Sequence, residues 1–188
     1  MPLKKAAKKA AKKAAKKGGK HHGPEHDQGR DLRRAYEHLG RLEALRDSLG
    51  KPVAAQINVL IEMARSCLQR DDAKSAAELL RACEHLGFGA LAPGGKDAGV
   101  GEALLESIER HYNHLIERAA DRWDENDEEP SGEIAEIYDE TFTAAESAFK
   151  KGAYRRALEL ARGAEALTHV RIAGLSLEGV LEKKKLKG

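Results

Sequence analysis

The sequence predicts an all-α fold in a single helical domain. Its 188 residues include 31 Ala and 22 Leu, two residue types that favour helix. Val, Ile, Thr, Phe, Tyr and Trp, which suit a pleated sheet, together number only 23. Apolar residues recur every three or four positions along most of the chain, which is the period of an amphipathic helix. We therefore expect about six antiparallel helices around one core of moderate size.

The first three helices are expected within residues 31–49, 53–68 and 73–87. Each of these segments carries a stripe of Leu, Ile, Val or Ala with helical spacing. A Gly-Lys-Pro break at residues 50–52 separates the first two, and the Asp pair at residues 71–72 separates the second from the third. We expect the third helix to end at its glycine, the usual residue after a helix C-terminus.

The last three helices follow a loop of about 13 residues, 87–99, which is rich in Gly and Pro. They are expected within residues 104–123, 131–149 and 154–167, and Gly152 marks the turn between the last two. The acidic stretch 124–129 ends the helix expected within residues 104–123. All five prolines of the chain fall outside the interiors of the predicted helices, where proline would break the hydrogen-bond pattern.

Composition excludes several classes of protein. No run without a charged residue or His exceeds ten residues, the length of 86–95, which is too short to span a bilayer. The N-terminus also lacks the apolar stretch of a secretory signal. Cys67 and Cys83 are the only cysteines, and neither has the C-x-x-C or zinc-ligand spacing. We therefore expect a soluble protein without a membrane partner, in a reducing, cytoplasmic compartment.

Charge is distributed unevenly along the chain. Residues 1–20 contain nine lysines and no acid, and residues 183–188 contain four lysines and no acid. Residues 21–182 hold 20 basic against 31 acidic residues, a net charge of −11. Blocks of like charge usually project as solvated tails that bind polyanions. We expect a disordered basic tail and linker over 1–30, a helical domain over 31–182, and a basic C-terminal tail over 183–188.

The N-terminal lysines are the candidate nucleic-acid-binding residues. They occur in pairs every four residues, so a helix would gather them on one cationic face. Repulsion between neighbouring lysines disfavours that helix in water, and phosphates would relieve the repulsion. The segment has no aromatic residue, Arg, Asn or Gln, so we expect binding without base recognition. The candidates are Lys4, Lys5, Lys8, Lys9, Lys12, Lys13, Lys16, Lys17 and Lys20.

The Lys-Lys-Ala-Ala repeat of residues 4–17 resembles the basic tails of linker histones and of bacterial histone-like proteins. This resemblance implies attachment to DNA without sequence reading. It also implies a location on the nucleoid, or in the nucleus if the source is a eukaryote. A solubilising tail that is incidental to a scaffold remains an alternative. Anionic lipid is a weaker candidate ligand because no apolar anchor or lipidation motif adjoins the lysines.

The body contains an internal repeat. At an offset of 81, residues 63–86 align with residues 144–167 without a gap, and eight of 24 positions are identical. Both copies place the turn between their helices at the same position, which predicts two homologous helical hairpins. In this register the two cysteines fall opposite alanines. We therefore expect both cysteines to be small core residues without a redox or metal-binding role.

The second hairpin resembles a tetratricopeptide (TPR) unit. Ala145 stands at the small residue of the first helix of such a unit, and Gly152 and Tyr154 stand at its turn. Ala157 and Ala164 stand at the small positions of the second helix. The resemblance implies TPR-like helical hairpins.

Arg162 and His169 form an R-x6-H pattern that resembles the ribonuclease motif of HEPN domains. The preceding residues 153–167 are similar to the stretch that those domains place before the motif. The resemblance implies that the Arg holds a scissile phosphate and that the His acts as an acid or base. A HEPN-like ribonuclease is therefore the enzymatic alternative.

Other histidines do not form a convincing metal site. His21, His22 and His26 lie in the expected linker without fixed geometry, and His111 and His114 lack a third ligand. We expect His111 to be a hydrogen-bonded histidine at the core or its rim. The chain has no Gly-rich phosphate loop, G-x-S-x-G or HExxH motif. No cofactor or metal is expected.

The leading prediction is a non-enzymatic helical module that binds a protein partner, as yet unknown, through its body. Its lysine-rich tail tethers it to DNA or another polyanion. The uneven charge distribution supports this prediction most directly.

Overall fold

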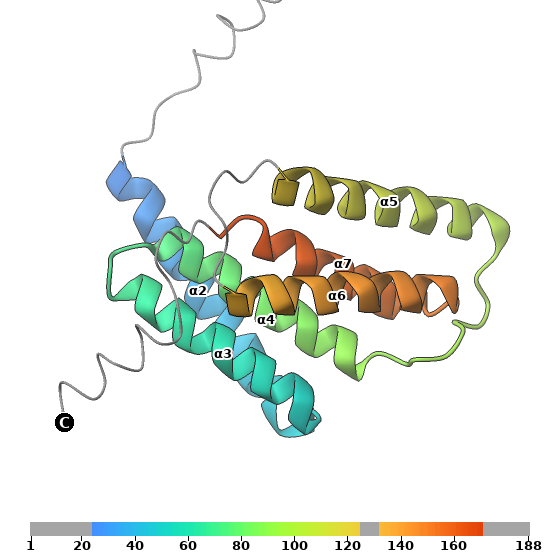
Figure 1. The fold of residues 1–188 in the computed structure, drawn as a ribbon, viewed down its shortest axis with the longest axis horizontal. Coiled ribbons are helices and arrows are strands. Elements are labelled where there is room, and N and C mark those ends of the chain that lie inside the picture. Colours follow the sequence, from blue (N-terminus) through green and yellow to red (C-terminus); the bar gives the residue numbers. More distant parts are fainter. Residues whose placement is uncertain (1–23, 125–131, 171–188) are drawn as a thin grey trace, which may run out of the picture.

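The computed structural model describes residues 24–124 and 132–170 (Figure 1). These ranges contain helices and no strand, so the prediction of an all-α fold is confirmed. No helix within them is long and apolar enough to cross a membrane. The α-helices are α2 (Pro24–Leu45), α3 (Lys51–Leu68), α4 (Ala73–Leu91), α5 (Glu102–Asp124), α6 (Gly132–Lys150) and α7 (Tyr154–Leu167), with a short 3-10 helix, η2 (Arg46–Ser48), after α2.

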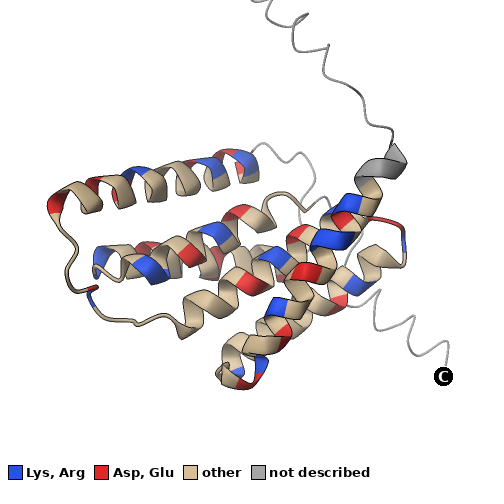
Figure 2. Ribbon diagram, turned by 180° about the vertical axis from the view of Figure 1, so that it is seen from behind, with Lys and Arg blue, Asp and Glu red and all other residues tan. Residues whose placement is uncertain are grey.

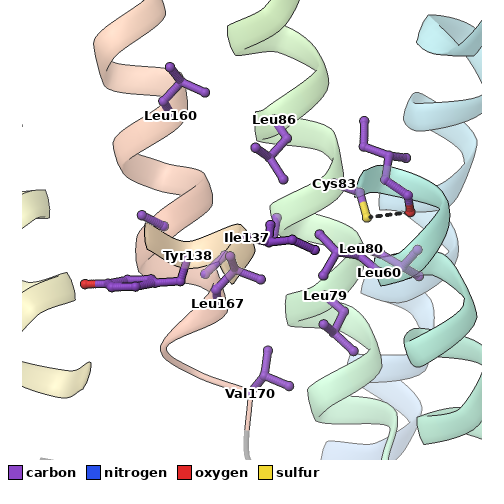
Figure 3. Close-up of a cluster of buried hydrophobic side chains, with 14 of the residues drawn as sticks. Leu60, Leu79, Leu80, Cys83, Leu86, Ile137, Tyr138, Leu160, Leu167 and Val170 are labelled. Atoms are coloured by element: carbon purple, nitrogen blue, oxygen red, sulfur yellow. Dashed lines mark hydrogen bonds between the residues drawn. The ribbon is translucent and has the colours of Figure 1, made fainter. Parts of the chain in front are cut away.

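Helix α4 lies at the centre of the fold (Figure 1). Helices α2, α3 and α7 pack against it, while α5 and α6 pack against α7. The helices thus form two units of three, α2–α3–α4 and α5–α6–α7, which meet along α4 and α7. Apolar side chains from both units form one continuous core (Figure 3). Its largest fully buried members are Leu60, Met63, Leu79, Ile134, Leu167, Cys67 and Cys83.

Helices α4 and α7 approach each other at small residues. A Cβ atom added to Gly89 would lie 2.8 Å from Cδ2 of Leu160, too close for any real contact. A Cβ atom at Gly163 would lie 3.7 Å from the carbonyl oxygen of Ala82. Glycine is useful at such positions because it lets one helix backbone come close to another. Ala82 and Gly163 are also equivalent at the 81-residue offset, so the contact is made by matching positions of the two units.

The turns that precede α4 and α7 share one geometry. Asp71 and Gly152, which are 81 residues apart, both have positive φ, at 61° and 74°. In each turn the N–H of the next residue donates to the carbonyl five positions earlier, at 3.0 and 2.9 Å. The alignment therefore places the turn correctly in both hairpins. Their homology and their TPR-like character stay predictions.

The two units cap these helices differently. The carboxylate of Asp72 accepts a hydrogen bond from the N–H of Ser75 at 3.0 Å and so caps α4. The matching residue before α7 is Ala153, which has no side-chain acceptor. A residue of the α4–α5 loop takes its place, because Asp97 accepts from the N–H of Arg155 at 2.9 Å. The loop therefore supplies the cap that the second unit lacks.

We expect Asp97→Ala to lower the free energy of unfolding by about 1 kcal/mol, the usual contribution of a helix cap. Asp97→Asn is the matched control, because its amide oxygen can still accept the hydrogen bond. Urea unfolding of both variants checks the prediction. If both variants lose the same free energy of unfolding, the hydrogen bond from Asp97 to α7 does not account for the loss.

Two of the predicted helix boundaries were wrong. Helix α2 begins at Pro24 and not after a linker to residue 30, because proline suits the first turn of a helix, where its missing N–H is not needed. Helix α4 does not end at Gly87 but continues to Leu91. A Cβ atom at Gly87 would already lie 3.4 Å from Cδ1 of Leu45. The glycines of α4 thus serve close packing instead of ending the helix.

Both cysteines are core residues, as predicted. Cys67 and Cys83 are free, and each is 0% exposed. Burial raises the pKa of the Cys67 thiol to about 11 and also raises that of Cys83. The Cys83 thiol donates to the carbonyl oxygen of Ile57 on α3 over 3.8 Å (Figure 3). Neither thiol has the lowered pKa of a reactive cysteine.

Candidate functional site

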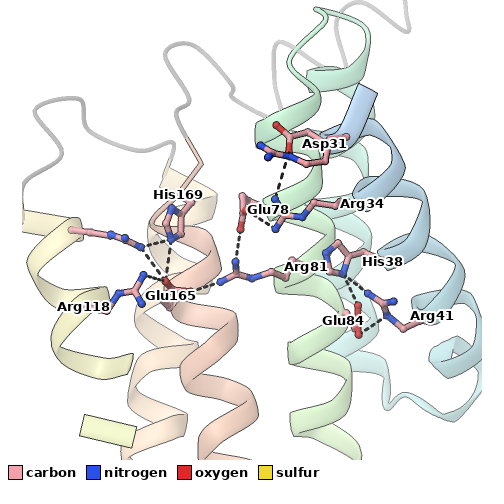
Figure 4. A network of polar contacts seen from close by, with 12 residues as sticks. Asp31, Arg34, His38, Arg41, Glu78, Arg81, Glu84, Arg118, Glu165 and His169 are labelled. Carbon is pink, nitrogen blue, oxygen red and sulfur yellow. Dashed lines mark hydrogen bonds and ion pairs between the residues drawn. The ribbon is translucent and has the colours of Figure 1, made fainter. Parts of the chain in front are cut away.

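A row of charged side chains joins α2, α4, α7 and α5 (Figure 4). We call it the charged network. Basic and acidic residues are interspersed along the ribbon of these helices (Figure 2). The acids at its centre are buried, with Glu78, Glu84 and Glu165 only 5 to 7% exposed. Its members are Asp31, Arg34, His38, Arg41, Glu78, Arg81, Glu84, His85, His111, Arg118, Arg122, Glu159, Arg162, Glu165 and His169.

In the first unit, the acids of α4 bind basic residues of α2. His38 Nδ1 lies 2.6 Å from one carboxylate oxygen of Glu84, and Arg41 Nε donates a hydrogen bond to the other at 2.8 Å. Glu78 pairs with Arg34 of α2 at 3.3 Å. Burying a carboxylate is costly unless it is paired and hydrogen-bonded. These contacts supply that compensation and tie α2 to α4.

In the second unit, four basic groups converge on Glu165. The side-chain nitrogens of Arg118, Arg122 and His169 lie 2.9, 3.0 and 3.0 Å from its Oε1. Its Oε2 contacts Arg81 of α4. Burial alone would raise the pKa of this carboxyl. The hydrogen bond from His169 and the positive charge of Arg81 outweigh that effect and lower the pKa to about 2. The carboxylate thus remains ionised and links α4, α5 and α7.

A third carboxylate, Glu159, completes the pattern. His85 Nδ1 of α4 lies 2.8 Å from its Oε2, and Arg162 Nη1 lies 2.7 Å from its Oε1. Burial would raise the pKa of Glu159, but the hydrogen bond from His85 and the charges beside it lower the pKa below its usual value. Like Glu84 and Glu165, this carboxylate is held by a histidine and at least one arginine. The lowered pKa values of Glu159 and Glu165 make these two carboxyls poor proton donors at neutral pH.

Sequence reasoning missed this network, although its signal lay within the internal repeat. Residues 78–84 read ELLRACE, and residues 159–165 read ELARGAE. The three charged positions of each heptapeptide, spaced three apart, are identical in the two copies and lie along one side of a helix. When both copies of a repeat keep the same charged residues in a buried helix, those residues are expected to form ion pairs with other helices. The alignment was interpreted only through its small and apolar residues.

The structure places the R-x6-H residues in different ion clusters. Arg162 pairs with Glu159 and lies 3.5 Å from His111 Nε2 of α5. His169 follows the end of α7 and pairs with Glu165 and Arg122. Each of the two side chains therefore serves a different carboxylate, and the contacts do not bring them to one point. A HEPN-like ribonuclease activity stays a prediction that this placement does not favour.

The remaining histidines form no metal site in the described parts of the chain, and His111 contacts only Arg162 of the charged network. Within residues 24–124 and 132–170, no group of three or more His, Cys, Asp or Glu side chains could hold a metal ion. His111 and His114 are exposed on α5, so the expectation that His111 lies at the core or its rim is wrong. His21, His22, the side chain of His26 and the nine candidate lysines of residues 1–20 lie outside the described parts of the molecule.

No protein-family model matches this chain, and comparisons with curated proteins and with solved structures also find no match. A function has therefore to be inferred from the chain's own residues.

Proposed function

We propose that this protein is a non-enzymatic helical interaction module that its lysine-rich N-terminus tethers to DNA or another polyanion. The body selects a protein partner and the lysines provide attachment without reading base sequence. In a cell this corresponds to a cytoplasmic protein associated with the nucleoid, or to a nuclear one in a eukaryote.

The separation of charge is the observation that carries the proposal. Residues 1–20 hold nine lysines and no acid, next to a body with a net charge of −11. Within the body, many guanidinium groups are already paired with carboxylates. These are Arg34, Arg41, Arg81, Arg118, Arg122 and Arg162. Since their charge is compensated inside the fold, the lysines of the N-terminus are the better candidates for phosphate contacts.

A titration of labelled duplex DNA with the full chain, followed by fluorescence anisotropy over a salt series, tests the proposal. If about six to nine lysines neutralise phosphates, the log–log dependence of affinity on salt should have a slope of about −5 to −8. The affinity should then fall by about 10³- to 10⁵-fold between 50 and 200 mM salt. Removal of residues 1–20, which leaves every described residue in place, should abolish this binding.

Two matched variants separate charge from chain length. Replacing all nine N-terminal lysines by Gln should act like the deletion, because neutral side chains release no counterions. Replacing them by Arg should preserve the salt slope. Equal DNA affinity of the full chain and of residues 21–188 would refute the proposal.

A further inference from the structure

Helices α2 and α3 leave an apolar groove between them. Both pack on α4, and residues of both helices line two hollows. Their linings combine apolar residues with polar and charged ones, which are Gln28, Glu43, Arg46, Asn58, Arg65 and Asp71. The hollow near the start of α2 has a volume of about 430 Å³, and Leu32, Tyr36, Leu68 and Ala73 are among its lining residues. The second hollow, of about 70 Å³, is lined by residues that include Leu39, Leu42, Ile57 and Ile61. We call both together the α2–α3 groove.

Large apolar side chains at this groove are open to solvent. Leu32 is 39% exposed and Tyr36 is 64% exposed, and together they account for two of the four exposed large hydrophobic residues in the described ranges. Apolar surface gathered beside a hollow often marks a place where another segment binds.

The second unit fills the corresponding gap with its own aromatic rings. Between α5 and α6, Tyr112 stacks on Phe149 with ring centroids 4.1 Å apart. Trp123 stacks on Tyr138 at 3.9 Å. Such stacked rings bury a large apolar area. The α5–α6 gap therefore needs no further segment to cover it.

The 81-residue offset shows why the first unit differs. The rings that α6 contributes are replaced in α3 by smaller aliphatic side chains, and these line the α2–α3 groove. Tyr138, Phe142 and Phe149 correspond to Ile57, Ile61 and Leu68. The same position between helices is thus filled in one unit and open in the other, which leaves room for additional apolar side chains.

The chain itself offers an occupant. The described residues end at Val170, which belongs to the buried core (Figure 3). The twelve residues that follow, 171–182, can extend about 40 Å. The 18 residues of α3 span only about 27 Å, so the segment is long enough to cover the groove. Its apolar residues are Ile172, Leu175, Leu177, Val180 and Leu181.

We propose that residues 171–182 bind in the α2–α3 groove of their own chain and cover Leu32 and Tyr36. Their apolar side chains fill the space that the rings of α6 fill in the second unit. The free energy comes from removing apolar surface of both partners from water. This inference does not depend on the binding of a polyanion, and it can hold where the proposed function fails.

A nitroxide spin label on Ser176→Cys of the full chain tests the proposal by NMR. The two native cysteines are buried, so the label attaches at the introduced position. We expect the methyl signals of Leu32, Leu39, Ile61 and Leu68 to be lost, and that of Ile134 in α6 to persist. Groove methyl signals that persist alongside that of Ile134 would overturn the proposal.

Matched leucine variants show whether the groove itself holds the segment. Leu32→Asp, at the rim of the groove, should restore the methyl signals of Leu39, Ile61 and Leu68. Leu104→Asp, at an exposed leucine of α5, should leave them lost. Equal behaviour of the two variants would count against the groove. Loss of the groove signals of isotope-enriched chains that carry no spin label, when these are mixed with spin-labelled chains, would assign the groove to a second copy and would also overturn the proposal.

Discussion

Replacement of Glu165 by Ala is expected to lower the free energy of unfolding by about 3 kcal/mol, near the lower end of the cost of breaking a buried ion pair. The variant leaves Arg81, Arg118, Arg122 and His169 close together without their shared carboxylate. The lower end applies because the side chains of Arg118 and Arg122 are 41% and 35% exposed and can turn toward water.

Urea unfolding followed by circular dichroism measures this loss. Glu146→Ala is the control, because the side chain of Glu146 is 45% exposed and makes a single ion pair with Lys150 at 3.7 Å. An exposed pair of this kind contributes about 0–1 kcal/mol. If the two variants lose the same stability, the convergence of basic groups on Glu165 does not stabilise the fold.

The protein is also expected to lose stability in acid through the same carboxyl. The pKa of Glu165 is lowered from 4.5 to about 2 in the folded chain. A lowered carboxyl pKa adds stability that is fully present above the unfolded pKa and is lost as the pH falls through the folded pKa. The window therefore lies between about pH 4.5 and pH 2, and the shift corresponds to about 3 kcal/mol. The lowered pKa of Glu159 acts in the same direction.

The measurement compares the free energy of unfolding of the native chain and of Glu165→Gln from pH 7 to pH 2. The Gln variant should be less stable at pH 7, and its stability should fall less steeply below pH 4.5, because it lacks the carboxyl that takes up a proton. Parallel curves for the two proteins would show that Glu165 is not the titrating group.

Much of the fold could be predicted from the sequence because it depends on local patterns. The scarcity of sheet-forming residues fixed the all-α class, and apolar stripes located all six described helices. The start of α2 and the end of α4 were missed for a common reason. Pro24 and Gly87 are read as breaks when only neighbouring residues are considered, but the first lies in an opening helical turn and the second faces Leu45. Position within the helix explains the first case, and tertiary packing explains the second.

The charged network could not be predicted with its partners because its contacts between helices join residues 43 to 84 positions apart. Spacing within one helix shows that Glu78, Arg81 and Glu84 share a side. It does not show that basic residues of α2 pair with Glu78 and Glu84. Nor does it show that an acid of α7 pairs with Arg81. The resemblance based on Arg162 and His169 has the same weakness, because it assumed that two residues along one helix act on a common target.

The burial of the two thiols makes them natural reporters of motion in the first unit. Cys67 and Cys83 lie on adjacent helices, and their raised pKa values keep the reactive thiolate scarce at neutral pH. An alkylating reagent can therefore modify them only when α3 and α4 separate. The rate of modification thus reports how often the two helices separate.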